Sequence, residues 1–385
     1  MEQRPIPRRR AALTLTGANF FIYGMTSAYS AFMPVYLSAH HSSIVKGYLL
    51  SIGCVVSLFA PVAVGKLTDR ARSKNLVLAV IAALAAVLFS ASYLSSGAVY
   101  LAVVLAALTF CNSPLGGLLD TVTLEGTAAG GVAYGPVRMM GTVGFGVVAV
   151  VMGILATRSL GAAFAVYPAV AALGIVCLLR APQTPGHADP REKLPVLPIL
   201  RDRNIRLLFL LNAVGYFCFF YCQHFYNEYV LDLLGLPAWV WGLHSFMNIL
   251  LEIPFFFLFD KIMRRVSLRA MLSVCMAVSV VRYLLLPVVS TAAGILLTAA
   301  LTGGWVTFIT YCVTLYIKRH MPPALIASSI GLQYALPLGA GTLLADLAGG
   351  YLTSFLGIRG GLFLCAGICA LAFPCALLLR VPKEA

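Results

Sequence analysis

Two ionisable residues lie deep inside apolar stretches of this sequence, and together they could exchange a proton. Glu252 interrupts the apolar run 238–259, and Arg282 interrupts the run 268–289. A charge inside a membrane-length segment is costly, so it is expected to face the protein interior or water and to have a partner. A glutamate that gains and loses an arginine partner can load and release a proton. We therefore predict that Glu252 and Arg282 form a proton-coupling site, with a static ion pair between helices as the alternative.

Polar side chains at helical spacing form a second group of candidates. Most of them recur every three to four positions in the runs 12–37 and 205–230, which puts them on one face of a helix. Amides can hydrogen-bond solute hydroxyls and tyrosine faces can stack on rings, so we predict that this group binds a small organic solute. Structural hydrogen bonding between helices is the alternative, particularly for the histidine. The predicted solute-binding residues are Asn19, Tyr23, Asn212, Tyr216, Gln223, His224, Asn248 and Gln333.

A third group of residues lies at the ends of apolar runs, where it could control access. Gly65, Asp69 and Arg70 follow the second run, and Asp69 can accept hydrogen bonds from a helix N-terminus or an arginine. The glycine is expected to let two helices approach closely. Asp120 and Arg138 lie at the same depth in neighbouring runs, so we expect them to form an ion pair. We predict that these five residues form a gate; a purely topological charge cluster is the alternative for the first three.

The elements that must position these residues are membrane-spanning helices. Hydrophobic residues make up 61% of the chain, charged residues make up 10%, and the mean hydropathy is +0.93. A spanning helix needs about 20 mainly apolar residues. The sequence contains twelve such runs, at 12–37, 44–64, 75–95, 98–119, 137–157, 160–179, 205–230, 238–259, 268–289, 291–316, 326–348 and 359–379. We predict an all-α membrane protein with twelve transmembrane helices and no separate soluble domain.

The net charge of +14 could suggest nucleic-acid binding, but the basic residues alternate along the chain. All but five of the 27 lysines and arginines lie at the termini or at even-numbered joints between runs. The exceptions are Lys46, Arg158 and Arg359 at odd joints and Arg138 and Arg282 within runs. Basic joints stay in the cytoplasm. Both termini are therefore expected in the cytoplasm, and no nucleic-acid partner is predicted.

The ten cysteines all fall inside apolar runs and are expected to be small core side chains. Neither a histidine nor a carboxylate accompanies the cysteine pairs at helical spacing, so we predict no metal site. No cofactor is predicted either. The basic start of the chain precedes an apolar run that is too long for a signal-peptide core, so we expect no cleaved signal.

The seventh apolar run repeats the first. Asn19 and Tyr23 align with Asn212 and Tyr216, 193 positions later. Between the sixth and seventh runs, a segment mixes five prolines with charged residues, a composition that argues against a packed domain. We therefore predict a six-helix half over 1–180, a cytoplasmic linker over 181–204 and a second, pseudo-symmetric six-helix half over 205–385.

Three motifs resemble the major facilitator superfamily. Gly65, Asp69, Arg70 and Lys74 fit its signature G-x-x-x-D-R-x-G-R-R/K, although the internal Gly-Arg pair is missing. The segment 134–145 is similar to the pattern Y-G-x-x-R-x-x-G-x-x-G-F of a branch that contains lactose permease, nucleoside:proton symporters and phenylpropionate-type permeases. The sequences around the deep glutamate and the deep arginine resemble the eighth and ninth spans of the same branch.

The resemblance implies a secondary transporter in which the solute binds at mid-membrane between two halves. In the relatives the acid on the eighth span is linked to proton coupling, which implies that role for Glu252. The signature implies a gate function for the joint at Gly65. The tenth span here lacks the histidine or acid that several relatives have, so a coupling network that needs a tenth-span histidine is excluded.

These observations predict a proton-coupled symporter that moves a sugar, nucleoside or aromatic acid by alternating access. Proton-driven efflux of drugs or metabolites is the alternative. An enzyme is not expected, because Glu252 is the only acid placed deeply enough for a buried catalytic site. The expected location is the cytoplasmic (inner) membrane of a bacterium, with the lipid bilayer, the solute and protons as partners and a monomer as the functional form.

Overall fold

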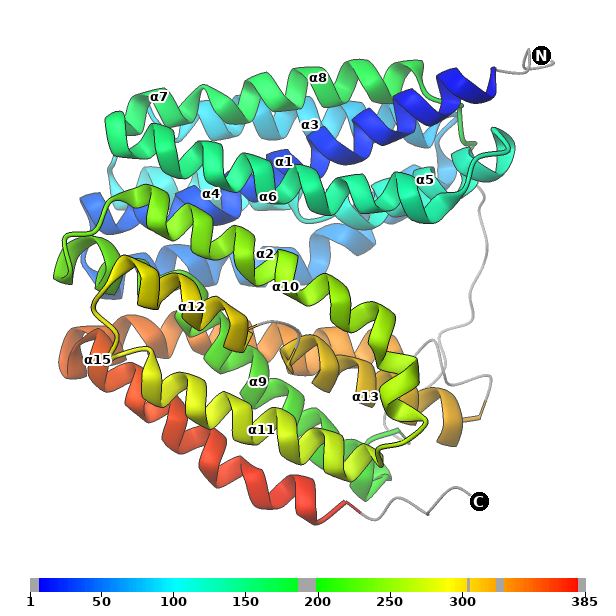
Figure 1. Ribbon diagram of the computed structural model, residues 1–385. Helices are drawn as coiled ribbons and strands as arrows, with labels where there is room; N and C mark the ends of the chain where they lie inside the picture. Colours follow the sequence, from blue (N-terminus) through cyan, green and yellow to red (C-terminus); the bar gives the residue numbers. More distant parts are fainter. Residues whose placement is uncertain (1–6, 186–198, 303–304, 323–328, 380–385) are drawn as a thin grey trace. The chain divides into compact units, whose positions relative to one another are not determined.

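A computed structural model describes residues 7–185, 199–302, 305–322 and 329–379 of the chain (Figure 1). The described residues form helices and short turns, and none of them lies in a strand. The chain divides into two compact units. The first comprises Met1–His40, Ile52–Pro190 and Pro237–Phe246, and the second comprises His41–Ser51, Arg191–Leu236 and Met247–Ala385.

The first unit holds the early helices. They are α1 (Arg8–His40), all but the first turns of α2 (Ser43–Arg70), α3 (Lys74–Ala91), α4 (Ala98–Asn112), α5 (Leu115–Ala129), α6 (Tyr134–Arg158), α7 (Leu160–Phe164), α8 (Val166–Arg180) and the first turns of α10 (Ala238–Met263).

The second unit holds the later helices and the start of α2. Its elements are the 3₁₀ turn η1 (Ile199–Arg201), α9 (Arg203–Glu228), the π-helical turn η2 (Tyr229–Leu233), the rest of α10, α11 (Leu268–Leu285), α12 (Ala292–Thr302), α13 (Trp305–His320), the π-helical turn η3 (Tyr334–Ala340) and α15 (Gly341–Leu377).

The predicted spans are mostly helical where the structure describes them, with short non-helical parts such as 92–95 and 286–289. Nine helical segments of the described residues are long and apolar enough to cross a membrane. The last of these, Ser329–Leu377, contains the final two predicted spans, which are separated at Gly357, where φ is 68°. The long helices α1 and α10 occupy the first and eighth predicted spans. The predicted all-α membrane fold is thus confirmed.

Side chains at helix starts explain where several spans begin. Ser73 accepts a hydrogen bond from a backbone N–H in the first turn of α3, and Ser267 does the same for α11. Asp202 accepts two such bonds at the start of α9. These residues satisfy backbone donors that have no partner within the helix.

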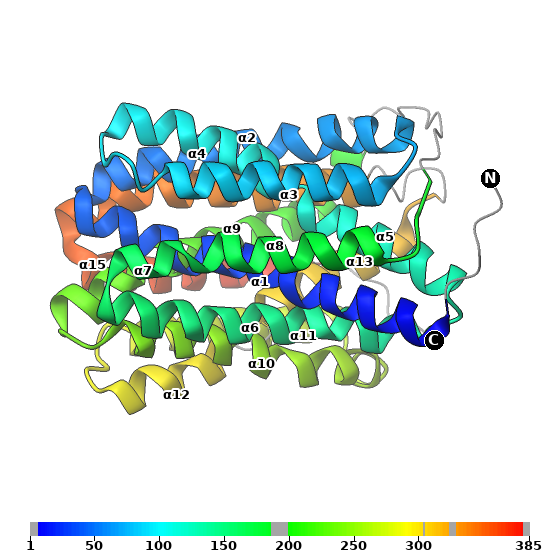
Figure 2. The ribbon, with the colours of Figure 1, turned by 90° about the horizontal axis from the view of Figure 1, so that it is seen from above.

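The first unit is organised around α1, which packs against α5, α6 and α8. Figures 1 and 2 show α1, α3, α6 and α8 running side by side over most of their length. A Cβ atom at Gly141 would lie 2.5 Å from the Tyr23 ring, and one at Gly144 would overlap the backbone of Phe20. The lack of a side chain at these two glycines therefore lets α1 and α6 pack tightly.

The second unit is organised around α9, which packs against α13 and α15. A Cβ atom at Gly341 would lie 2.8 Å from the carbonyl oxygen of Ala213 on α9. Aromatic side chains of α9 fill the interface with α15: Tyr221 and Phe225 both lie against Gly349. The centre of this unit, α9, carries Asn212, Tyr216, Gln223 and His224, which we call the second polar stripe. The first polar stripe is the pair Asn19 and Tyr23 on α1.

The first residues of the predicted linker are tied to the start of α3. The side-chain amide of Asn75 donates to the carbonyls of Leu178 and Pro182, each at 3.1 Å. Its oxygen accepts from the backbone N–H of Thr184 at 3.2 Å and from the Thr184 hydroxyl at 2.9 Å. Most of the predicted linker, residues 186–198, lies outside the described residues.

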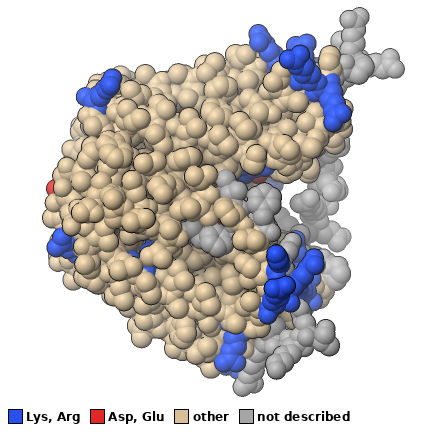
Figure 3. Space-filling model, in the orientation of Figure 1, with Lys and Arg blue, Asp and Glu red and all other residues tan. Residues whose placement is uncertain are grey.

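Charged side chains gather at helix ends. Uncharged residues cover the helical flanks on the face shown in Figure 3, where lysine and arginine side chains lie near the ends of the helices. The last turns of α2, α8 and α13 carry basic residues, as in Arg70, Arg180 and Lys318. This pattern fits helices whose middles lie in lipid.

Candidate functional site

The deep glutamate is held by a threonine in the second unit. Glu252 is half-buried on α10, and its carboxylate accepts a short hydrogen bond from the Thr307 hydroxyl on α13. A carboxylate at this depth needs such a donor, because neither lipid nor apolar side chains can stabilise its charge. The contact fixes the side chain of Glu252 against α13.

Threonines of α13 connect Glu252 to the second polar stripe. Thr307, Thr310 and Thr314 recur at helical spacing and so lie along one face. The Thr310 hydroxyl lies 3.1 Å from Oδ1 of Asn212 and 2.9 Å from the hydroxyl of Tyr216, both on α9. The polar cluster therefore joins α9, α10 and α13.

Gln333 extends the same cluster. Its amide group donates to the backbone carbonyl of Thr310 at 3.0 Å and accepts from the Thr314 hydroxyl at 3.2 Å. The Nδ2 donor of Asn212, a fully buried residue, has no acceptor among the described residues. The cluster thus brings together three predicted solute-binding residues, Asn212, Tyr216 and Gln333, and leaves one of their donors without a bond.

Sequence reasoning missed the threonines that hold this cluster. Their hydroxyls lie on an otherwise apolar helix, and their partners are far away along the chain. The available signal was the spacing of Thr307, Thr310 and Thr314, which is the spacing used to identify the stripes on the first and seventh spans.

Arg282 is buried and donates hydrogen bonds to a tyrosine and a cysteine. It is 1% exposed, and it donates to the Tyr283 hydroxyl at 3.2 Å and to Sγ of Cys222 at 3.5 Å. Within the described part of the chain, Arg282 and Glu252 form no ion pair. The alternative of a static ion pair between Glu252 and Arg282 is therefore wrong for this structure. Arg282 contacts α9, and Glu252 contacts α13.

The first unit holds a separate charged cluster. Nε of Arg138 on α6 lies 2.6 Å from Oδ1 of Asp120 on α5, so the expected ion pair is confirmed. The Tyr23 hydroxyl on α1 donates to the same carboxylate oxygen at 2.9 Å, and the guanidinium lies 4.2 Å from the centre of the Tyr23 ring. Asp120 is 39% exposed and Arg138 30% exposed, so water screens the pair and limits its contribution to stability.

Asn19 lies one turn before Tyr23 on α1. Its Nδ2 donates to Oγ1 of Thr123 at 2.8 Å and to the carbonyl of Leu15 at 2.9 Å. The residue is fully buried, and its Oδ1 has no donor among the described residues. The first polar stripe thus joins α1 to α5 through Asn19 and Tyr23.

The remaining predicted solute-binding residues lie elsewhere in the second unit. Gln223 is half-buried on α9, and Asn248 is half-buried on α10. Nδ1 of His224 lies 2.5 Å from Oδ1 of Asp346 on α15. His224 is therefore bonded to a buried acid, an arrangement that the sequence did not predict.

The predicted gate at the end of α2 is only partly described. A Cβ atom at Gly65 would meet no described atom within 4 Å, so the expected close helix approach at Gly65 is wrong for this structure. Arg70 is exposed, and the side chain of Asp69 lies outside the described part. Nearby, Nζ of Lys74 forms an ion pair with Glu125 at 2.5 Å.

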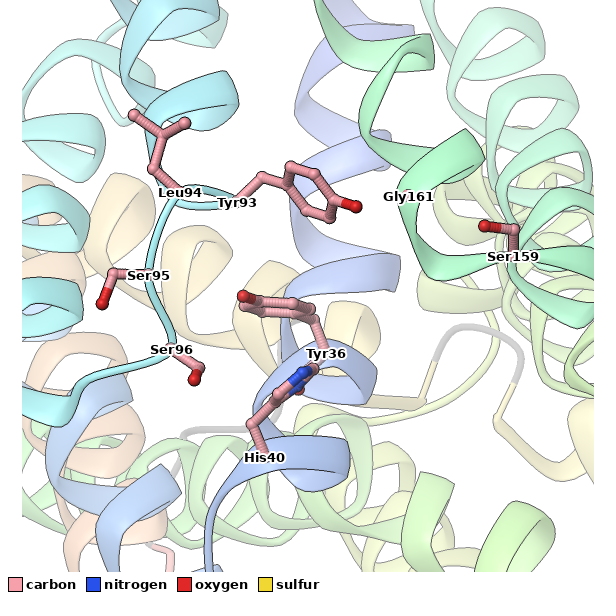
Figure 4. Close-up of a pocket in the computed structure, with 8 residues that line it drawn as sticks. All are labelled: Tyr36, His40, Tyr93, Leu94, Ser95, Ser96, Ser159 and Gly161. Carbon is pink, nitrogen blue, oxygen red and sulfur yellow. The ribbon is translucent and has the colours of Figure 1, made fainter.

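A cavity of about 720 Å³ lies at one end of the first unit (Figure 4). It is lined by Tyr36, His40, Tyr93, Leu94, Ser95, Ser96, Ser159 and Gly161. The Tyr93 ring points toward Gly161, and Tyr36 and His40 lie one turn apart on α1. The cavity contains none of the predicted site residues. No group of three or more metal-binding side chains occurs among the described residues.

Comparison with known proteins identifies transporters. The model of the MFS_1 like family matches residues 12–359. The chain is 24% identical to the uncharacterized transporter YwbF of Bacillus subtilis, over 94% of this chain and 92% of that protein. It is 25% identical to the maltose permease of Geobacillus stearothermophilus, over 95% and 93%.

Solved structures show the same fold. A structure of the nucleoside transporter NupG matches with a TM-score of 0.86 and 16% identity, and covers 96% of this chain and 100% of that chain. A bacterial homolog of the human lysosomal transporter Spinster matches with a TM-score of 0.72 and 12% identity, over 98% and 97%. At these identities the likeness establishes the fold alone.

Proposed function

The chain belongs to the MFS_1 like family of the major facilitator superfamily, and from this premise we propose that it is a proton-coupled symporter of a small organic solute. The observation that carries the proposal is the contact between Glu252 and Thr307 beside the cluster of Asn212, Tyr216 and Gln333. A titratable carboxyl and solute-type hydrogen-bonding groups are thereby joined through one helix.

The proposed coupling depends on the charge of Glu252. As a carboxylate, it accepts a hydrogen bond from the Thr307 hydroxyl. Once protonated, the carboxyl group can itself donate, and the half-buried site loses its negative charge. Because an uncharged site costs less to enclose in an apolar environment than a charged one, proton binding favours the conformational change that carries both proton and solute.

The proposed solute contacts are the amide and hydroxyl groups around Thr310. The unpaired Nδ2 of Asn212 offers a donor, and Tyr216 and Gln333 offer further polar atoms. Such groups fit a sugar, a nucleoside or an aromatic acid. The maltose permease and NupG carry names that point to a sugar and to nucleosides, and these are the first two classes to test.

We place the protein in the cytoplasmic membrane of a bacterium as a monomer with both termini in the cytoplasm, on the basis of the alternating basic joints. In this proposal the six-helix halves are 1–180 and 205–385, connected by the linker 181–204. Asp120 and Arg138, with the Tyr23 hydroxyl bonded to Asp120, act as a gate in the first half. The ion pair between Asp120 and Arg138 is exposed enough to break and re-form.

The test uses the full chain in proteoliposomes. Counterflow of labelled sugars, nucleosides and aromatic acids identifies the solute, and an imposed inward proton gradient then drives its accumulation. We expect Glu252→Gln to retain exchange down the solute gradient but to lose accumulation. Asp232→Asn is the matched control, since Asp232 is an exposed acid of the same unit outside the polar cluster, and it should still accumulate solute.

Two outcomes would contradict the proposal. Undiminished uphill transport by the Glu252→Gln protein would remove the coupling role of this residue. Transport driven only by the opposite proton gradient would instead indicate the efflux alternative.

A further inference from the structure

The start of α2, the end of α9 and the early part of α15 meet closely within the second unit. A Cβ atom at Gly350 would lie 2.6 Å from the carbonyl oxygen of Ser43, and one at Gly47 would overlap the carbonyl of Asp346. Only glycine fits at these two positions. The close contact between α2 and α15 places Lys46, near the start of α2, beside Glu228 at the end of α9.

Lys46 is fully buried and is paired with one acid. Its Nζ lies 3.0 Å from Oε1 of Glu228 and 3.1 Å from Oδ1 of Asn227, and it sits over the Phe225 ring at 4.7 Å. The second oxygen of Glu228 accepts from the Ser43 hydroxyl at 2.9 Å. One buried positive charge is thus matched by one nearby negative charge.

A second acid, Asp346, lies in the same junction and forms no ion pair with a lysine or arginine among the described residues. Asp346 is 1% exposed, and its bonded partner is His224, one turn before Glu228 on α9, with Nδ1 and Oδ1 2.5 Å apart. The His224 side chain is 16% exposed, so its ring is the part of the pair that solvent can reach. A distance this short requires a proton between the two atoms.

The buried charges determine how many protons the pair carries. Lys46 attracts both Glu228 and Asp346, so one buried positive charge faces two carboxylates. Burying the uncompensated negative charge is strongly unfavourable. The junction is neutral if His224 is protonated on both nitrogens or if Asp346 is protonated. Either state holds one more proton than a neutral imidazole beside a carboxylate.

The other ionisable groups on these elements do not supply the missing charge. They include Lys46 and Tyr48 of α2, Tyr221 and Glu228 of α9, Asp232 of η2 and Arg359 of α15. The buried Arg282 of α11, which packs against α15, donates to Tyr283 and to Cys222 on α9 and forms no ion pair with Asp346 among the described residues. Asp232 and Arg359 are exposed and therefore solvated, and tyrosines are uncharged near neutral pH.

We propose that His224 and Asp346 form a proton-binding site, separate from Glu252, that holds one exchangeable proton at neutral pH. Losing that proton leaves a net negative charge next to the first turn of α2, because the backbone of Asp346 touches Gly47. Lys46 then has two carboxylates to compensate instead of one. The junction of α2, α9 and α15 thereby responds to pH, whether or not Glu252 couples transport.

The decisive experiment is infrared spectroscopy of the full chain in lipid nanodiscs at neutral pH. In His224→Gln, the proton has only Asp346 to bind, so a protonated carboxyl band is expected. The band should be absent from the double variant His224→Gln/Asp346→Asn. It should persist in His224→Gln/Asp232→Asn, which removes a neighbouring but exposed acid. A His224→Gln spectrum without any band that depends on Asp346 would overturn the proposal.

A second measurement uses the unmutated protein, so the conclusion does not depend on whether a variant folds correctly. With ring-¹⁵N histidine, solid-state NMR at pH 8 should show one ring that is doubly protonated or shares its proton with a carboxyl group. A spectrum in which every histidine is neutral and lacks a shared proton would contradict the site. Neither measurement needs solute or transport, so failure here is distinct from failure of the Glu252 proposal.

Discussion

Replacing Thr310 with valine tests whether the polar cluster of the second unit is a real stabilising network. Valine keeps the shape of threonine and removes the hydroxyl that bonds Asn212 and Tyr216. Asn212 is fully buried, and its Nδ2 already has no acceptor among the described residues. The substitution therefore removes the partner of its Oδ1 as well.

The expected cost follows from these contacts. A buried polar group left unsatisfied costs about 1–3 kcal/mol in soluble proteins. Measured hydrogen bonds between membrane helices average about 0.6 kcal/mol and reach about 1.7. Because two groups on α9 lose a partner together, we expect Thr310→Val to lower the free energy of unfolding by about 1–2 kcal/mol. The same change should also weaken solute binding, because Asn212 and Tyr216, the proposed solute contacts, lose the hydroxyl that positions them.

The assay is equilibrium unfolding of the full chain in mixed micelles, combined with solute-binding measurements. Thr342→Val is the matched control, because the Thr342 hydroxyl bonds the carbonyl of Leu338 in its own preceding turn, and it should change stability by less than about 0.5 kcal/mol. In a double-mutant cycle, Thr310→Val and Tyr216→Phe should couple by about 0.5–1 kcal/mol. Equal costs for the two threonine substitutions, or no coupling with Tyr216, would refute the network.

Further predictions concern the first unit. Gly144→Ala should prevent normal packing of α1 on α6, because the added Cβ overlaps the backbone of Phe20, whereas Gly135→Ala meets no described atom within 4 Å and should be neutral or slightly stabilising; melting temperatures of the two variants check this. Arg138→Gln should change stability by less than about 1 kcal/mol, because its pair with Asp120 is partly exposed, but should slow solute exchange if the pair is a gate. A normal exchange rate would leave the pair without a gating role.

The sequence predicted best the properties that depend only on position along the chain. Span positions follow from apolar length, and the pair of Asp120 and Arg138 follows from opposite charges at one depth on consecutive helices. The failures concern rotation about the helix axis and distant partners. Glu252 and Arg282 lie on consecutive helices but face different neighbours.

The junction around Lys46 shows a second limit of sequence reasoning. Lys46 was counted as a joint residue, yet it is fully buried against Glu228, which is 182 positions away. Pairings of this kind depend on which helices pack together and on how closely glycines such as Gly47 and Gly350 let them approach. The spacing of residues along the chain predicts neither the packing partners nor the closeness of approach. Lys46 was detectable only as one of the few basic residues at an odd joint.

The turn at Gly357 has a practical consequence for mapping which side of the membrane each joint faces. With φ at 68°, a value that glycine alone adopts easily, the last two spans connect through a single residue. An epitope inserted there would have to pull two helices apart before an antibody could reach it. The exposed residues 93–97 form a true loop at another joint expected on the same side, so a reporter placed there would report orientation without disturbing either neighbouring helix.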